Sequence, residues 1–119
     1  MSNPKEVCVE VSVTSRPSGE RIVVHVTGEI DVYTAPILRE ELATLIDAHH
    51  TDLVVDLSDV SFMDSTGLGV LVGALKKIKT VGGDLRLVID QEKVLKVFRI
   101  TALTQVFPIY ATVDEALKD

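Results

Sequence analysis

The sequence has little of the chemistry from which disulfide frameworks and metal cages are built. Among its 119 residues are one cysteine, Cys8, and three histidines. A lone cysteine excludes an internal disulfide and a cysteine-based metal site. The spacing of the histidines supplies no ligand set, so we expect no metal and no cofactor, and we assign His25, His49 and His50 structural or solvent roles.

Basic residues are also scarce. The chain carries 12 Lys and Arg against 18 Asp and Glu, which gives a formal net charge of −6. A chain this acidic repels nucleic acid and anionic membranes. Its one basic cluster, Lys76, Lys77 and Lys79, contains no aromatic residue that could stack on bases, and we interpret it as a solvated helix face. We therefore expect neither nucleic acid nor membrane as a partner.

Segments that would direct the chain into or across a membrane are missing as well. The longest apolar stretch is far shorter than the ~18 residues that a membrane span needs. The residues after Met1 show neither a basic n-region nor an apolar h-region. The chain is therefore expected to be cytoplasmic. Its hydrophobic content of 46% and charged content of 25% are typical of a soluble globular protein, and its length predicts one domain, residues 1–119.

Two strands are predicted at the start of the chain, followed by alternating helices and strands. Val7, Val9, Val11 and Val13 lie at a period of two, which predicts a half-buried strand. Residues 16–20 contain residues typical of turns. A second strand is predicted over residues 21–27, and residues 28–31 are expected to end it. Together these segments predict an antiparallel hairpin with a slightly long loop.

Helical spacing and short apolar runs then alternate to the end of the chain. Helices are predicted after a cap at Thr34, from the segment 64–69 to a stop at residues 82–83, over 92–100, and from a capping box at Thr112. Strands are predicted over 53–57, 85–89 and 106–110, the last at a sheet edge because Pro108 lacks an N–H. This order predicts a small α/β domain with about four helices and a mixed sheet, antiparallel at the start and then parallel.

The segment that joins the third predicted strand to the next helix is the most unusual. Asp64, Ser65 and Thr66 are all good helix-capping types, whereas Gly67 and Gly69 lower the helix propensity by ~1 kcal/mol each relative to alanine. Glycine there allows a partner to approach the hydroxyls closely. Capping and a functional loop remain equally open on these grounds. The motifs of nucleophile-elbow hydrolases, P-loop proteins and aspartic proteases are not matched, so no enzymatic activity is predicted.

Two segments together resemble the signatures of bacterial anti-sigma factor antagonists, which are members of the STAS domain family. Phe62-Met63-Asp64-Ser65-Thr66-Gly67-Leu68-Gly69 is similar to the phosphorylation motif of that family. Gly28-Glu29-Ile30-Asp31 is similar to its second signature, a Gly-Glu-Leu/Ile-Asp segment after the second strand. The resemblance covers nearly the whole chain and implies a regulatory protein without catalytic activity.

The resemblance also implies a mechanism. The unphosphorylated protein would bind an anti-sigma factor with serine kinase activity and so free a sigma factor. Phosphorylation would end that complex, and a PP2C-type phosphatase would restore it. By this resemblance Ser65 is the phosphoacceptor, Thr66 is the minor candidate, and Asp31 belongs to the partner-binding region.

The expected partner-binding residues follow the second and third predicted strands. They are Glu29, Asp31, Asp59, Asp64, Thr66, Gly67, Leu68 and Gly69. If the two strands are parallel, their carboxylates gather around Ser65 at one end of the sheet. A phosphate would add about −1.5 to −2 charges to this acidic rim. Free N–H groups at the helix start could hold it in part.

Two other functions stay open. One is a nucleotide- or lipid-sensing regulatory module, in which the loop with Gly67 and Gly69 binds a phosphate. The other is a scaffold subunit of a stress-sensing assembly. For the protein-only switch, the free chain is expected to be a monomer. Binding of labelled nucleotide and the mass of a native complex would discriminate among the three.

Overall fold

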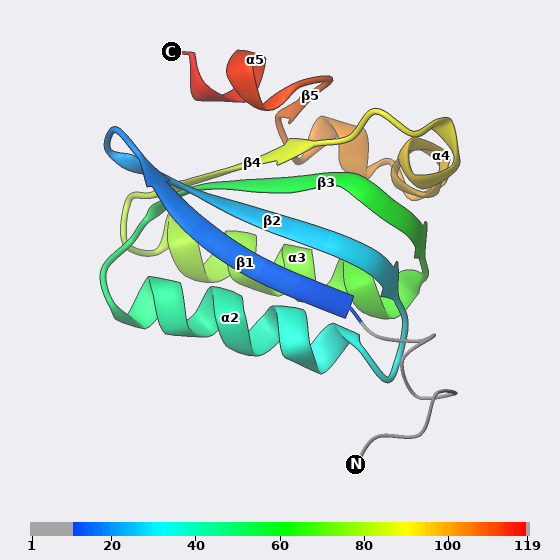
Figure 1. The fold of residues 1–119 in the computed structure, drawn as a ribbon, viewed down its shortest axis with the longest axis horizontal. Coiled ribbons are helices and arrows are strands. Elements are labelled where there is room, and N and C mark those ends of the chain that lie inside the picture. The colour runs from blue at the N-terminus through cyan, green and yellow to red at the C-terminus, as the bar shows by residue number, and fades with distance from the viewer. Residues whose placement is uncertain (1–10, 119) are drawn as a thin grey trace.

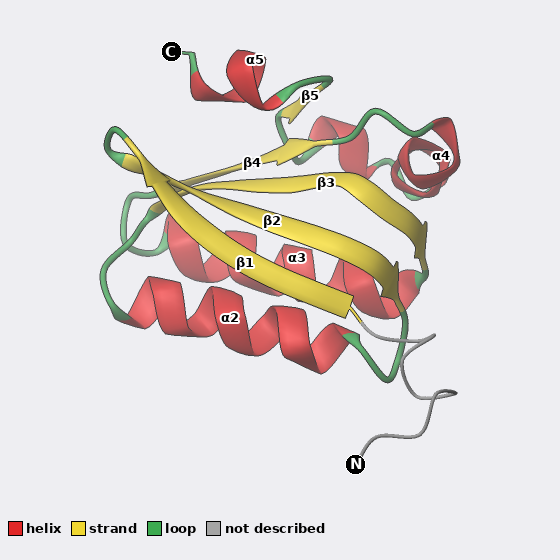
Figure 2. Ribbon diagram, viewed as in Figure 1, coloured by secondary structure: helices red, strands yellow, loops and turns green. Residues whose placement is uncertain are grey.

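The computed structural model describes residues 11–118, which form one mixed sheet with helices packed against it (Figures 1 and 2). The strands are β1 (Val11–Ser18), β2 (Arg21–Ile30), β3 (Asp52–Met63), β4 (Asp84–Val88) and β5 (Ile109–Tyr110). The helices are α2 (Ala35–Asp47), α3 (Ser65–Lys79), α4 (Glu92–Ile100) and α5 (Val113–Leu117), and residues 103–105 form a 3₁₀ helix.

The sheet follows the order of the chain. Its strands are arranged β1-β2-β3-β4-β5, with β1 antiparallel to β2 and every later pair parallel. Helices α2 and α3 connect β2 to β3 and β3 to β4, and they lie side by side against the sheet (Figure 1). The predicted α/β class, with an antiparallel start and parallel continuation, is confirmed.

Two apolar clusters cover the two faces of the sheet. Val24 and Val55 belong to the main core, together with Leu38 of α2 and Leu71 of α3, each of which is 0% exposed. The residues that alternate with these in the strands point to the opposite face. There a smaller cluster consists of Val23, Val54, Val88 and Ala116 of α5. The apolar side chains that recur at helical spacing in the sequence therefore pack α2 and α3 against one face of the sheet.

The first hairpin is tighter than predicted. Strand β1 continues to Ser18, so its loop consists of Gly19 and Glu20 instead of residues 16–20. Pro17 is accommodated in β1 because β1 lies at the edge of the sheet, where a missing N–H breaks no ladder. Val7, Cys8 and Val9, which belong to the predicted strand, lie outside the described residues.

Strands β2 and β3 are both longer than predicted. Strand β2 continues through Gly28 to Ile30, and β3 continues to Met63 instead of ending at residue 57. The register shifts between His25 and Thr27 and again between Gly28 and Glu29. Gly28 has a φ of 102°, a conformation that favours glycine, so it forms an irregularity within the strand rather than its end. As a consequence, residues 58–63 are strand and not loop.

The C-terminal third largely agrees with the sequence pattern. Helix α4 has the predicted bounds, and β5 lies at the predicted edge but contains only two residues. Phe107, predicted to be in that strand, precedes it and packs edge-to-face on Phe98 at 6.1 Å between ring centroids. The Thr112 Oγ1 accepts a hydrogen bond from the Glu115 N–H at 3.2 Å, which is half of the predicted capping box.

Candidate functional site

Two connections meet at one edge of the sheet. Residues 31–34 join β2 to α2, and Asp64 joins β3 to α3. The two strands are parallel, with Ile30 opposite Met63, and the Asp64 N–H donates to the Ile30 carbonyl at 3.2 Å. Parallel strands end at the same edge, where open α/β sheets commonly carry their sites. Asp31, Asp64 and Ser65 are therefore brought to one end of the sheet.

Asp31 holds the start of α2. Its Oδ1 accepts hydrogen bonds from the N–H groups of Tyr33 at 2.9 Å and Thr34 at 3.0 Å. The Thr34 hydroxyl accepts from the Asp31 N–H at 2.9 Å and donates to the Glu29 carbonyl at 2.7 Å. Thr34 occupies the predicted N-cap position, but its side chain caps no helical N–H because these bonds engage it. Asp31 therefore has a structural role that the sequence did not reveal.

Asp64 holds the start of α3 in a similar way. Its Oδ1 accepts from the Thr66 N–H at 2.9 Å and also from the Thr66 hydroxyl. The Asp64 carbonyl accepts from the N–H groups of Gly67 at 3.1 Å and Leu68 at 3.3 Å. These three N–H groups are therefore engaged, and of the first-turn donors in the described residues only the N–H of Ser65 remains free to hold a phosphate.

Ser65 and Thr66 differ in the availability of their hydroxyls. Both side chains are exposed at the first turn of α3. The Thr66 hydroxyl is bound to Asp64, whereas within residues 11–118 the Ser65 hydroxyl forms no hydrogen bond. A free, exposed hydroxyl can be reached and deprotonated by another protein, so the geometry distinguishes the two candidates.

Gly67 and Leu68 face the core instead of a partner. A Cβ atom on Gly67 would lie 2.7 Å from Ile30 Cγ2 and 2.9 Å from Met63 Cγ, so glycine is required there for close packing. Leu68 is only 5% exposed. Direct contact with a partner, expected for both, is not available to them. At Gly69, by contrast, a Cβ would meet nothing within 4 Å, so this glycine does leave the surface open.

Asp59 lies within β3 and does not follow it. Its Oδ2 is 3.1 Å from the Nε2 of His25, and the Nδ1 of His25 is 3.0 Å from the Oδ2 of Asp56. This arrangement corrects the expectation that Asp59 joins the carboxylates around Ser65. Sequence reasoning missed the pairing of His25 with two carboxylates because it depends on the register between β2 and β3.

Asp56 is the one buried carboxylate in this group, at 6% exposure. Burial by itself raises the pKa of Asp56, but hydrogen bonds from the Ser58 hydroxyl at 2.7 Å and N–H at 3.0 Å, together with His25, outweigh burial. The net result is a pKa of Asp56 below its ordinary value. The ionised form is therefore favoured by folding.

Replacing Asp56 with asparagine should destabilise the fold at neutral pH by about 1–3 kcal/mol, because the Asp56 carboxylate accepts charge-assisted hydrogen bonds. A lowered pKa contributes stability above the ordinary carboxyl pKa of about 3.9, and that contribution is lost as the pH falls through the folded-state value. The difference between wild type and Asp56→Asn should therefore shrink below about pH 4. Urea unfolding at pH 7, 5 and 3 measures it, with Asp90→Asn as the exposed control. A difference independent of pH would contradict this assignment.

A cavity of about 390 Å³ adjoins Ser65. Its lining comes from the start of α2 and the loop before it and from the first turns of α3: Val32, Ala35, Pro36, Arg39, Ser65, Thr66, Gly69 and Val70. We call it the Ser65 cavity. Val32, in its lining, is 58% exposed, and the adjacent Tyr33 is 83% exposed. These two side chains offer apolar area at the mouth of the cavity to a partner.

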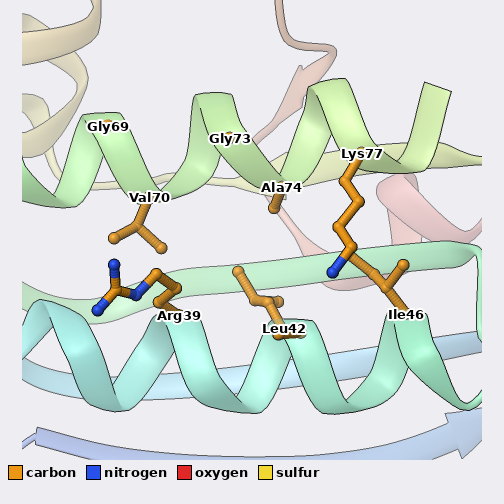
Figure 3. A pocket seen from close by; sticks show the side chains of 9 residues that line it. Arg39, Leu42, Ile46, Gly69, Val70, Gly73, Ala74 and Lys77 are labelled. Carbon is orange, nitrogen blue, oxygen red and sulfur yellow. The ribbon is translucent and has the colours of Figure 1, made fainter. Parts of the chain in front are cut away.

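A second hollow continues from this cavity along the crevice between α2 and α3 (Figure 3). This groove has a volume of about 260 Å³ and an apolar floor that includes Leu42, Ile46 and Ala74. Arg39, Gly69 and Val70 line both hollows. In Figure 3 the Arg39 side chain extends along the crevice beneath Val70. Arg39 therefore lies at the junction of the groove and the Ser65 cavity.

Two kinds of site are not found among residues 11–118. No group of three or more His, Cys, Asp or Glu side chains is placed to hold a metal ion. None of the helices in this part of the chain is both long enough and apolar enough to cross a bilayer.

Comparison with known proteins identifies the family. Residues 10–116 match the model of the STAS domain. The chain belongs to the STAS domain family. The anti-sigma-B factor antagonist of Bacillus subtilis is 44% identical to this STAS domain over 103 residues, which cover 87% of this chain and 94% of the relative.

Solved structures agree with that assignment. An anti-sigma factor antagonist from Mycobacterium paratuberculosis superposes with a TM-score of 0.86 at 31% identity, covering 98% of this STAS domain and 96% of that chain. The Bacillus cell fate determinant SpoIIAA, in its phosphorylated form, has a TM-score of 0.70 at 26% identity, covering 89% and 96%.

Proposed function

We propose that this STAS domain is a cytoplasmic anti-sigma factor antagonist that is switched by phosphorylation of Ser65. The unphosphorylated form binds an anti-sigma factor with serine kinase activity and thereby frees a sigma factor. A PP2C-type phosphatase reverses the modification. The observation that carries the proposal is the free, exposed hydroxyl of Ser65 beside the Ser65 cavity, next to a Thr66 hydroxyl that is bound to Asp64.

The geometry favours Ser65 over Thr66 as the acceptor. In the transfer, the Ser65 Oγ forms a bond to the γ-phosphorus of ATP, the bond from that phosphorus to ADP breaks, and the hydroxyl proton passes to a base of the kinase. The Thr66 hydroxyl would first have to leave Asp64. A phosphate on Thr66 would also lie beside the Asp64 carboxylate, and like charges at that separation repel.

The surface around Ser65 supports binding that depends on its charge. Val32 and Tyr33 supply exposed apolar contact area, and Glu29, Asp31 and Asp64 supply negative charge at the same edge. A partner with an apolar centre and a basic rim would fit this surface. A phosphate adds about −1.5 to −2 charges that such a partner was not shaped to meet, so affinity differs between the two states.

The names of two related proteins support the proposal. The Bacillus subtilis relative is an anti-sigma-B factor antagonist, and the SpoIIAA structure is of a phosphorylated form. The proposal assigns no catalytic step to this chain, since the kinase and the phosphatase carry out both reactions. It treats residues 1–119 as one domain, monomeric when free.

Incubation with an anti-sigma serine kinase and ATP, followed by mass spectrometric mapping, tests the proposal. We expect one phosphate, on Ser65. Ser65→Ala should abolish labelling, while Thr66→Ala should retain it, because Thr66 contributes only a second hydrogen bond to Asp64. Labelling found mainly on Thr66 or Ser61 would overturn the assignment of the acceptor.

A further inference from the structure

We propose that Arg39 is the phosphate-binding residue of the switch: once Ser65 is phosphorylated, the Arg39 guanidinium pairs with the phosphate and together they fill the Ser65 cavity. The inference rests on the proposed function, because it concerns the phosphorylated form of Ser65. It assigns a role to a side chain on α2 that neither sequence signature contains.

The first step is the charge inventory of the Ser65 cavity. Arg39 is the one charged side chain among the residues that line it. The nearby carboxylates at this edge, Glu29, Asp31 and Asp64, all carry the same sign as a phosphate. A phosphate on Ser65 therefore has one positive group within its own cavity and repulsion from the rim.

The second step is the availability of Arg39. Within residues 11–118 the Arg39 guanidinium forms no ion pair and no hydrogen bond. The other cation of the groove, Lys77, is paired with Asp47 at 3.4 Å. Arg39 therefore has no existing bond to give up. A guanidinium can also present two parallel N–H groups to phosphate oxygens, which a single amine cannot do.

The third step concerns the alternative ligand for the phosphate, which is the set of backbone N–H groups at the start of α3. Helix starts often hold anions through their free N–H groups. In α3 the N–H of Thr66 is taken by the Asp64 side chain, and those of Gly67 and Leu68 are taken by the Asp64 carbonyl. Among residues 11–118 the N–H of Ser65 is the one donor of this first turn without a partner, so the helix start offers a phosphate a single N–H. The side chain across the cavity, which carries a full charge, becomes the main ligand.

The fourth step is position. Ser65 begins α3 and Arg39 lies on α2, and these two helices pack side by side. Arg39 lies where the cavity meets the groove, and its long side chain extends along the crevice toward Val70, one turn into α3 (Figure 3). An ion pair across the cavity would cover Val32 and Pro36, the apolar wall available to a partner in the unmodified form. The phosphate thus acts by occupying the surface as well as by repulsion.

The test uses protein that carries phosphoserine at position 65 by co-translational incorporation, so no kinase is involved. ³¹P NMR titration gives the pKa of the phosphate in the otherwise wild-type chain, in Arg39→Gln and in Arg39→Lys. Arg16→Gln is the matched control, because Arg16 is exposed on β1 near the hairpin end of the sheet. Circular dichroism of each variant establishes that it is folded.

We expect Arg39 to lower the pKa of the phosphate by about half a unit to one unit, in opposition to the carboxylates of the rim, which raise it. Arg39→Gln should therefore raise the phosphate pKa above its wild-type value by that amount, Arg39→Lys should raise it less, and Arg16→Gln should leave it unchanged. Equal phosphate pKa values in wild type and Arg39→Gln would overturn the pairing. A kinase that fails to label Ser65 would overturn the proposed function instead, so the two failures are distinguishable.

Discussion

Replacing Ser65 with aspartate should weaken binding of the anti-sigma partner by about tenfold or more, whereas Ser65→Ala should change the affinity by less than about twofold. Tenfold corresponds to about 1.4 kcal/mol, which is a modest cost for placing an ionised carboxylate against the apolar centre of the partner. The aspartate adds negative charge beside Asp31 and Asp64 without removing apolar contact area. The alanine removes a hydroxyl that makes no hydrogen bond within residues 11–118.

Isothermal titration calorimetry of both variants measures the affinities. Ser15→Asp on β1 is the control, since it adds the same charge at an exposed serine outside the proposed surface. A folded Ser65→Ala variant that does not bind would mean that the hydroxyl itself is a required contact.

Replacing Gly67 with alanine should destabilise the domain by about 1–3 kcal/mol, the usual range for inserting a methyl group into a packed core. The new Cβ would lie 2.7 Å from Ile30 Cγ2 and 2.9 Å from Met63 Cγ, which are closer than real Cβ contacts. Both neighbours are buried, at 0% and 3% exposure, so neither moves away freely. Relief requires α3 to shift away from the ends of β2 and β3.

Gly69→Ala is the matched control in the same helix. Its Cβ would meet nothing within 4 Å, so only helix propensity changes, and this favours alanine by about 0.8–1.0 kcal/mol. Urea unfolding should therefore move the two midpoints in opposite directions. Equal shifts for the two variants would show that Gly67 is not packed as the structure describes.

Sequence patterns predicted the elements whose period is regular and missed the places where it is interrupted. Helix α4 had the expected bounds because Val94 and Phe98 face the core at helical spacing. The ends of β2 and β3 were missed because Gly28 resembles a strand terminator locally, and only its pairing with Val60 shows that the strand continues. Pro17 was assigned to a loop for the same reason.

Those parts of the candidate site that lie in a contiguous sequence motif could be predicted. Those parts that depend on the packing of distant segments could not. The sequence pointed to Ser65 and to the acidic segment around Asp31. It assigned Gly67 to partner access, because the close approach of Ile30 to Gly67 exists only in the folded structure. Arg39 was missed altogether because, on its own helix, it lies among other solvent-facing residues. Only the packing of α2 against α3 brings it to the Ser65 cavity.

The close packing of the first turn of α3 limits how the unmodified and phosphorylated forms can differ in structure. Gly67 packs closely on Ile30 and Met63 at the ends of β2 and β3, which restrains the backbone of the turn that carries Ser65. We therefore expect the modified and unmodified forms to share a backbone conformation, so that the phosphate and its pairing with Arg39 change the surface and not the fold. A partner that meets such a preorganised surface loses little conformational entropy on this side of the complex, so tight binding is compatible with a small interface. On the proposed mechanism, discrimination then requires no refolding step, and the kinase and the phosphatase would set the response time.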